Sequence, residues 1–151
     1  MILSTFDANI LVYTLRVPAN AKATDARDLL LRGARNASIA FLLQSLNEFS
    51  YVALRKLRMD VAIVRRRVAA LLRIAAPIHC PSEQDLANAL DLIRDHRLSF
   101  WDALMCTTAG RAGLRYLLTE DLQDGQRLGN LTIVNPFRPE NTALIEQILP
   151  N

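Results

Sequence analysis

The chain has 151 residues, of which 51% are apolar and 22% charged, and its 18 basic side chains nearly balance 15 acidic ones. This length predicts one domain over residues 1–151, large enough to bury its own hydrophobic core. The high apolar content and a net charge of only +3 exclude a chain that is disordered throughout. Two cysteines are too few for a disulfide scaffold, and no apolar run approaches the roughly 20 residues of a membrane span. We therefore expect a cytoplasmic protein with reduced thiols and no membrane partner.

The first half of the chain alternates short apolar segments with longer amphipathic ones. In chain order the pattern predicts a strand over Ile2–Phe6, helices over Ala8–Tyr13 and Ala21–Arg35, a strand over Ser38–Ala40, and helices over Leu42–Arg58 and Asp60–Ala75. Asn20 ends a loop that contains Pro18 and is suited to cap the second helix. Apolar side chains recur every three or four residues in the last two helices, at Leu42, Leu46, Phe49, Ala53 and Leu57 and at Val61, Val64, Val68, Leu71 and Leu72.

The second half repeats this alternation. It predicts a strand around Ile78, helices over Ser82–His96 and Ser99–Gly113, strands over Tyr116–Thr119 and Leu131–Val134, and a last short helix over Pro139–Leu149. Ser82 and Asp85 have the spacing of a capping box. We see no hairpin signal between the strands, so the order of elements favours an α/β fold with a parallel sheet covered by helices on both faces.

Basic side chains are concentrated in one segment, residues 55–73. Seven of them stand there against a single acid, so this segment carries +6 and the rest of the chain −3. The segment suits a partner rich in phosphate, with Arg55, Arg65, Arg66 and Arg67 as candidate contacts, or it is simply a solvated helix face. Aromatic residues are only 6% of the chain, so we expect no stacking platform for single-stranded nucleic acid.

Acidic residues stand at the ends of predicted strands, where ligands bind in an open parallel sheet. Asp7 follows the first strand and Asp121 follows the strand at Tyr116–Thr119, while Asp102 opens a helix and Glu48 lies within one. Each has an ordinary explanation as a cap, a turn residue or a surface residue. Taken together they suggest one acidic cluster, which needs a cation because the carboxylates repel one another.

An all-carboxylate cluster favours Mg²⁺ or Mn²⁺, since these hard cations prefer oxygen ligands. The spacing of His79, His96, Cys80 and Cys106 does not suit a zinc site. Cys106 is expected in the core, and Cys80 beside His79 makes a poor nucleophile and base pair. The chain also lacks the glycine-rich phosphate-binding loops and the G-x-S-x-G elbow.

Four segments resemble, in order, those of PIN-domain nucleases. They are F-D-A-N-I-L-V-Y at Phe6–Tyr13, Q-S-L-N-E-F at Gln44–Phe49, S-F-W-D-A-L at Ser99–Leu104 and L-L-T-E-D-L-Q-D-G at Leu117–Gly125, with I-V-N-P-F at Ile133–Phe137 as a matching end. The resemblance covers about residues 1–137, and the length and composition are similar to those of VapC-type toxins of toxin–antitoxin pairs. It departs from the family just before Gln44, where Phe41, Leu42 and Leu43 replace small hydroxyl residues.

The resemblance implies a PIN-like three-layer sandwich and a ribonuclease that depends on Mg²⁺ or Mn²⁺ and leaves 5′-phosphate and 3′-hydroxyl ends. By motif match, the metal-binding acids would be Asp7, Glu48, Asp102 and Asp121. Asn9 and Thr119 would support them by hydrogen bonds, Asp124 would be a further acid near the site, and Glu120 would face solvent. The resemblance also implies an RNA substrate, a cognate antitoxin and a homodimer.

Three other functions fit parts of the pattern. A non-catalytic α/β protein-binding domain of the receiver type needs a lysine late in the chain, whereas Lys22 and Lys56 come early. An aspartate phosphotransferase needs D-x-D at the first strand, where this chain has D-A-N. An inactive PIN domain would have lost acids that are all present here.

Overall fold

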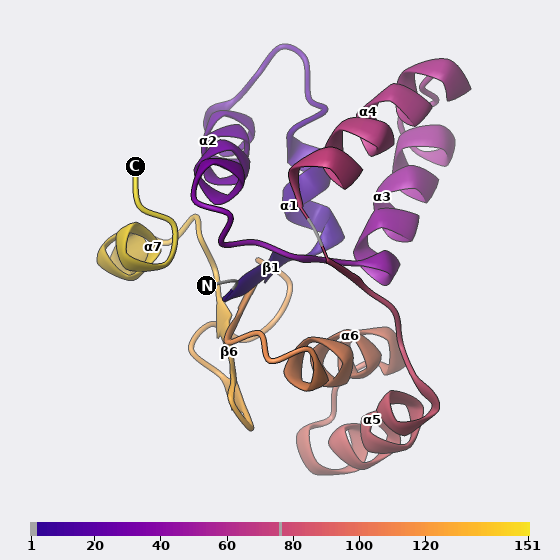
Figure 1. Cartoon of the computed structure of the whole chain (residues 1–151), viewed down its shortest axis with the longest axis vertical. Helices are drawn as coiled ribbons and strands as arrows, with labels where there is room; N and C mark the ends of the chain where they lie inside the picture. Colours follow the sequence, from indigo (N-terminus) through magenta and orange to yellow (C-terminus); the bar gives the residue numbers. More distant parts are fainter. Residues whose placement is uncertain (1–2, 76) are drawn as a thin grey trace.

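A computed structural model describes residues 3–75 and 77–151. The helices are α1 (Ala8–Tyr13), α2 (Ala21–Arg35), α3 (Leu43–Arg55), α4 (Val61–Ile74), α5 (Glu83–His96), α6 (Phe100–Arg111), the 3₁₀ turn η1 (Pro139–Asn141) and α7 (Thr142–Ile148) (Figure 1). The strands are β1 (Ser4–Phe6), β2 (Phe41–Leu42), β3 (Ile78–His79), β4 (Tyr116–Leu118), β5 (Arg127–Leu128) and β6 (Leu131–Val134). The predicted start of the first strand at Ile2 lies outside the described residues.

The central sheet has the strand order β1-β4-β6-β5. β1, β4 and β6 are parallel, with Phe6 paired to Leu118 and Leu118 paired to Val134. β2 and β3 form a separate parallel pair, which a single bridge between Ser4 and Ile39 joins to β1. The α/β fold with a mostly parallel sheet is therefore confirmed.

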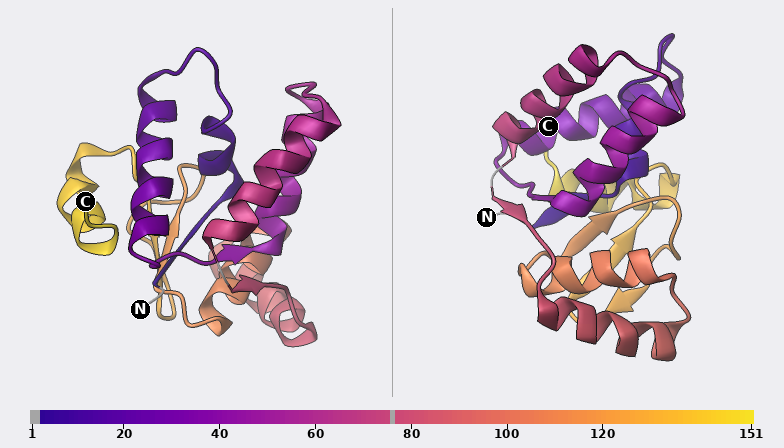
Figure 2. Two further views of the ribbon diagram at one scale, coloured as in Figure 1. Left: turned by 45° about the horizontal axis from the view of Figure 1, so that its top comes forward. Right: turned by 90° about the vertical axis from the view of Figure 1, so that its right-hand side faces the viewer.

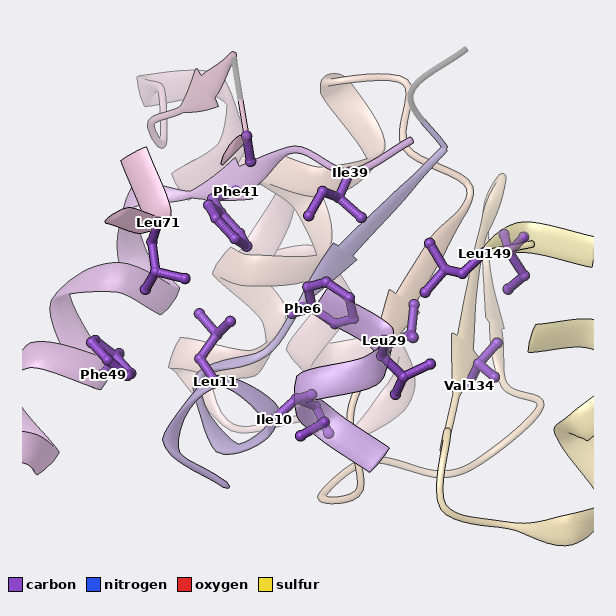
Figure 3. Packing of buried hydrophobic residues seen from close by; sticks show 14 of the residues in the cluster. Phe6, Ile10, Leu11, Leu29, Ile39, Phe41, Phe49, Leu71, Val134 and Leu149 are labelled. Carbon is purple, nitrogen blue, oxygen red and sulfur yellow. The ribbon is translucent and has the colours of Figure 1, made fainter. Parts of the chain in front are cut away.

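Helices cover both faces of this sheet (Figure 2). In its right-hand view, α5 and α6 lie on one side of the strands, and α1 to α4 lie on the other. Neighbouring strand residues point to opposite faces, so Leu118 and Val134 pack in one hydrophobic cluster and Leu117 and Ile133 in another. The larger cluster includes Phe6, whose ring centroid lies 6.5 Å from that of Phe41, and it reaches α3 and α4 (Figure 3).

The prediction of a sheet without a hairpin was wrong. β5 and β6 are antiparallel, with Leu128 paired to Leu131 across a two-residue turn. Gly129 supplies the positive φ of 62° that this turn requires. The dipeptide Gly129-Asn130 between two leucines is a hairpin signal that the sequence carries and that the alternation of longer elements hid.

The second predicted strand also lies elsewhere. Ser38–Ala40 contributes only the bridge at Ile39, and the strand proper is Phe41–Leu42. The reason is that the amide of Ala40 donates to the Ser4 carbonyl at 3.0 Å, after which the chain leaves β1 and pairs with β3.

The apolar stripes predicted for two helices include residues that are exposed. α3 ends at Arg55, because Arg58 adopts a left-handed φ of 51°, and Leu57 lies beyond the helix and is 47% exposed. In α4, Val64 and Leu71 are buried, but Val61 and Leu72 are exposed. The predicted stripes are therefore buried except at Leu57 in the first and at Val61 and Leu72 in the second, while Val68 is half-buried.

No helix in the described part of the chain combines the length and the apolar character needed to cross a membrane.

Candidate active site

The site forms where β1 and β4 end side by side. The pairing of Phe6 with Leu118 places the next residues, Asp7 and Thr119, beside each other. The Thr119 hydroxyl donates to Oδ2 of Asp7 at 2.7 Å, and the Ala8 amide donates to its Oδ1 at 2.6 Å. Asp7 is thus the N-cap of α1, and both of its carboxyl oxygens are held by the fold.

A second layer of hydrogen bonds brings Asp121 to the same edge. The Asn9 amide donates to Oδ2 of Asp121 at 2.7 Å and to the Thr119 hydroxyl at 3.2 Å. The backbone N–H of Asp121 also donates to the Thr119 hydroxyl, at 3.2 Å. The Asn9 amide oxygen is buried and has no hydrogen-bond partner among the described residues. Asn9 and Thr119 therefore connect Asp7 to Asp121.

Asp102 enters from α6, on the other side of the sheet from α1. The Ser99 hydroxyl accepts from the Asp102 amide at 3.2 Å and donates to its Oδ2 at 2.6 Å. The reciprocal bond from the Ser99 amide, which would complete a capping box, does not form here, whereas Ser82 and Asp85 form both halves. The other carboxyl oxygen of Asp102 is therefore not used to cap the helix.

Glu48 enters from the middle of α3 and is exposed. A hydrogen bond of 2.8 Å from the Gln44 side-chain amide to the Trp101 carbonyl ties the start of α3 to the first turn of α6. Because these two helices are held together, Glu48 and Asp102 border the same opening.

The four predicted acids line one cleft of about 800 Å³, whose walls are Asp7, Leu43, Gln44, Asn47, Glu48, Tyr51, Pro81, Ser99, Trp101, Asp102, Leu104, Met105 and Asp121. A second cleft of about 690 Å³ shares Glu48 and Asp121 with it and extends past Asn9 to Arg16 and Lys56. The acids thus stand at the junction of two adjoining clefts.

The buried position of Asp7 changes its acidity. Burial raises the pKa of Asp7 from 3.8 to about 6, against the lowering effect of the bonds from Thr119 and Ala8. The negative charges of Glu48 and Asp121 raise this pKa further. Burial, together with Asp102 and Asp7, also raises the pKa of the Cys106 thiol to about 12, so this cysteine is an inert core residue as predicted.

The donor set suits a hard divalent cation. The clefts offer four carboxylates and the unpartnered amide oxygen of Asn9, and neither histidine nor cysteine lines them. The carboxylates of Glu48 and Asp121 raise the pKa of Asp7 by their negative charge, and a bound cation would neutralise this repulsion. As the side chains stand, no three histidine, cysteine or acidic residues in the described ranges form a ready-made metal-binding group. The residues fit Mg²⁺ or Mn²⁺ in chemistry, and binding would draw their carboxylates closer together.

Asp124 lies outside both clefts. Its Oδ1 accepts from the Asn135 amide and from the Asn141 side chain, each at 2.8 Å, and Arg138 is 3.7 Å from its Oδ2. These contacts join the turn before β5 to the segment after β6, so Asp124 is placed in a structural network instead of among the four acids.

The prediction that Glu120 faces solvent was wrong. Its carboxylate accepts a hydrogen bond from the Tyr13 hydroxyl and forms an ion pair with Lys22. The Lys22 ammonium also lies over the rings of Tyr13 and Phe137, at 5.4 and 5.3 Å from their centroids. This cluster holds α1 and α2 against the turn that carries Asp121.

The predicted RNA contacts Arg55, Arg65, Arg66 and Arg67 are exposed but line neither of the two clefts. The cleft that shares Glu48 and Asp121 is lined instead by Arg16 and by Lys56, which belongs to the predicted basic segment. The sequence reasoning missed Arg16 and the cleft residues Tyr51 and Trp101. A signal was available, because Tyr51 lies three residues after Glu48 on one helix face and Trp101 directly precedes Asp102.

Comparison with known proteins identifies the class to which this fold and site belong. The PIN domain matches the chain over residues 5–126, which is most of its length, and the chain therefore belongs to the PIN-domain family. No curated protein matches it.

Solved structures of toxins have the same fold. A toxin–antitoxin complex from Klebsiella pneumoniae contains a chain that is 23% identical, with a TM-score of 0.62 over 89% of this chain and 98% of that one. A chain of VapBC2 from Rickettsia felis, solved bound to a DNA fragment from its promoter, is 17% identical, with a TM-score of 0.63 over 87% of this chain and 97% of that one. VapC20 from Mycobacterium tuberculosis, a sarcin–ricin loop cleaving toxin, is 14% identical, with a TM-score of 0.58 over 78% and 89%. The structural neighbours are thus VapC toxins, and the expected resemblance is confirmed.

Proposed function

We propose that this protein is an endoribonuclease that depends on Mg²⁺ or Mn²⁺ and acts as the toxin of a type II toxin–antitoxin pair. The observation that carries the proposal is the convergence of Asp7, Glu48, Asp102 and Asp121 on one cleft from four separate parts of the chain. PIN domains are typically nucleases and generally use divalent metals, which is consistent with this donor set.

The four carboxylates would hold the cation, with Asp7 as the innermost. A cation held there would supply Lewis-acid chemistry, which would make a water more acidic and offset the charge of the phosphodiester. The chain's own residues orient this arrangement: Thr119 fixes Asp7, Asn9 fixes Asp121, and Ser99 fixes Asp102. Asp102 lies in the first turn of α6, where the positive end of the helix dipole attracts negative charge.

The acids repel a polyanion, so cations elsewhere must attract the RNA. Arg16 and Lys56 line the adjoining cleft and are the candidates for contacts with RNA phosphates there. The arginines of α3 and α4 remain a prediction for more distant parts of the RNA.

We also propose a cognate antitoxin and a homodimer as partners. Two of the structural neighbours were solved as toxin–antitoxin assemblies. Exposed apolar residues on α3 and α4, namely Leu54, Val61, Ile63 and Leu72, supply surface that a partner could bury.

The test is cleavage of total RNA by the purified chain with Mg²⁺, with Mn²⁺ and with EDTA, alongside Asp102→Asn and the matched surface variant Asp91→Asn. We expect cleavage only with metal, its loss in Asp102→Asn, and wild-type cleavage in Asp91→Asn. Mapping of the ends should find 5′-phosphates. Cleavage in EDTA, or full activity of Asp102→Asn, would overturn the metal-dependent mechanism, and no cleavage under any condition would favour an inactive PIN domain.

A further inference from the structure

We infer that Trp101, assisted by Tyr51, stacks on an unpaired nucleobase next to the phosphate held at the acids. This inference rests on the proposed function and deepens it. Composition alone argued against such a platform, but it averages over the chain and does not report where the few aromatic rings lie.

Both rings line the cleft of the four acids, yet neither is used by the hydrophobic core. Trp101 is 63% exposed and Tyr51 is 61% exposed, although large aromatic side chains are on average more buried than this. The chain has only one tryptophan. Large exposed rings that gather at a cleft indicate a surface that is covered in use.

Each ring is fixed relative to one of the acids by the backbone. Trp101 directly precedes Asp102. Tyr51 lies three residues after Glu48 on α3, which is less than one helical turn. A phosphate bound at these acids therefore carries its base within reach of the rings.

The Trp101 segment is also held in place. The Gln44 amide donates to the Trp101 carbonyl at 2.8 Å, and the Phe100 ring packs edge-on against the indole, with centroids 5.0 Å apart and planes at 75°. A T-shaped contact with one neighbour covers at most one face of the indole, and a pre-positioned ring loses little entropy when a base stacks on its other face.

An unpaired base fits this site better than a duplex does. Asp7 is only 7% exposed at the base of the cleft, so the phosphate has to enter the cleft to come near it. The bases of a duplex are stacked on one another, whereas single strands can turn a base outward onto an aromatic ring. Arg16 and Lys56 in the second cleft would then contact phosphates on the other side of the acids.

The sole tryptophan provides a direct test. The full chain in Mg²⁺ is titrated with a short single-stranded oligoribonucleotide whose linkages are hydrolysis-resistant phosphorothioates, with a duplex of the same length and linkage, and with an abasic ribose-phosphate strand that lacks the bases. Tryptophan fluorescence reports stacking, and the anisotropy of a labelled strand reports binding. We expect the single strand alone to quench Trp101.

Variants separate stacking from charge. Trp101→Ala should weaken binding of the single strand about 10-fold, equivalent to about 1.4 kcal/mol and within the range for base stacking, while binding of the abasic strand stays unchanged. Trp101→Phe should restore most of the affinity, and Tyr51→Ala should weaken binding less than Trp101→Ala. Leu90→Ala, an exposed apolar residue on α5 outside both clefts, is the control and should bind like the wild type.

The outcomes distinguish this inference from the proposed function. Strand binding without quenching, equal binding of Trp101→Ala, or no binding of any strand overturns the stacking role. If quenching occurs as expected but RNA is not cleaved with Mg²⁺, the proposed nuclease activity fails and the stacking site stands. If Trp101→Ala binds and cleaves RNA normally but no longer binds the antitoxin, the ring belongs to a protein interface and the inference is wrong.

Discussion

The Thr119 hydroxyl donates to the buried carboxylate of Asp7 at 2.7 Å across the paired ends of β4 and β1. The same hydroxyl accepts from the Asn9 side chain and from the Asp121 amide. One side chain therefore holds two of the four acids, and it does so at a position that is fully buried. This relationship makes Thr119 a positioning residue whose removal should affect both the fold and the site.

Thr119→Val keeps the shape of the side chain and removes the hydroxyl. We expect the free energy of unfolding to fall by about 1–3 kcal/mol, because a buried carboxyl group loses its donor. The pKa of Asp7 should rise further, since this hydrogen bond lowers it. Urea unfolding measures the first effect and the pH dependence of Mg²⁺ binding the second. Thr119→Ser should recover both, and a Ser variant as impaired as Val would rule out the hydroxyl as the cause.

Asp7 should make the metal-free protein less stable as pH rises. Its pKa is about 6 in the fold against 3.8 for an ordinary aspartate, so the folded state binds this proton more tightly than the unfolded state does. The stabilising contribution is complete below about 3.8 and is lost as pH rises through about 6, which amounts to about 3 kcal/mol. Asp7→Asn should lack this decline and be the more stable protein in EDTA at neutral pH. Denaturant unfolding at several pH values tests this, and parallel curves for the two proteins would contradict it.

Glu48→Gln should separate activity from stability. Glu48 is exposed, so the melting temperature should stay near that of the wild type, within the change of about 0.5 kcal/mol usual for surface substitutions. Cleavage should fall by more than about 100-fold. Loss of a residue that only supports a metal ligand already costs roughly 10–100-fold, and Glu48 is proposed as a ligand itself. Calorimetric titration with Mn²⁺ should show weaker binding. Glu146→Gln on the exposed part of α7 is the matched control and should behave as the wild type.

Glu120 should act on the reaction through Asp121. Glu120→Ala removes the acceptor for Tyr13 and the ion pair with Lys22, which together brace the turn before Asp121. We expect a loss of about 1 kcal/mol in unfolding free energy, and a lower kcat with weaker Mn²⁺ binding. Glu120→Gln keeps an acceptor for the Tyr13 hydroxyl and should recover most of the activity. If Glu120→Ala binds Mn²⁺ as the wild type does, the cluster stabilises the fold without positioning Asp121.

Charge reversals should locate the cations that contact RNA. Arg16→Glu with Lys56→Glu should lower the slope of log affinity against log salt by about 1.4, since each phosphate contact on a single strand contributes about 0.7. Reversal of Arg65, Arg66 and Arg67 tests the basic segment and should lower the slope by up to about 2 if all three contact phosphates. Reversal of the exposed Arg35, Arg115 and Arg127, which line neither cleft, changes the charge as much as that triple and is its control. A triple variant that matches this control would show that the basic segment is a solvated face.

Local rules predicted much of the fold. Asp7, Asn20, Asp60, Ser82 and Ser99 all cap the helices that follow them, because a short acceptor side chain before an apolar run satisfies the first free amides. The parallel strands were predicted from a different local rule, because they are short apolar runs between helices. The β5–β6 hairpin was missed because β5 has only two residues and carries almost no pattern of its own, so the turn signal at Gly129-Asn130 had only one recognisable strand beside it.

The sequence by itself determined the chemistry of the site: two carboxylates that follow strands, one in the first turn of a helix and one within a helix, with no histidine or cysteine in a metal-binding pattern. Only the tertiary structure decided which other groups join them. The bond from Gln44 to the Trp101 carbonyl joins segments 57 residues apart, and Trp101 lines the same cleft as the acids. Glu120 is turned away from solvent by Lys22 of α2, which is distant in the sequence. Such contacts depend on the packing of whole helices against the sheet, and no local sequence pattern encodes that packing.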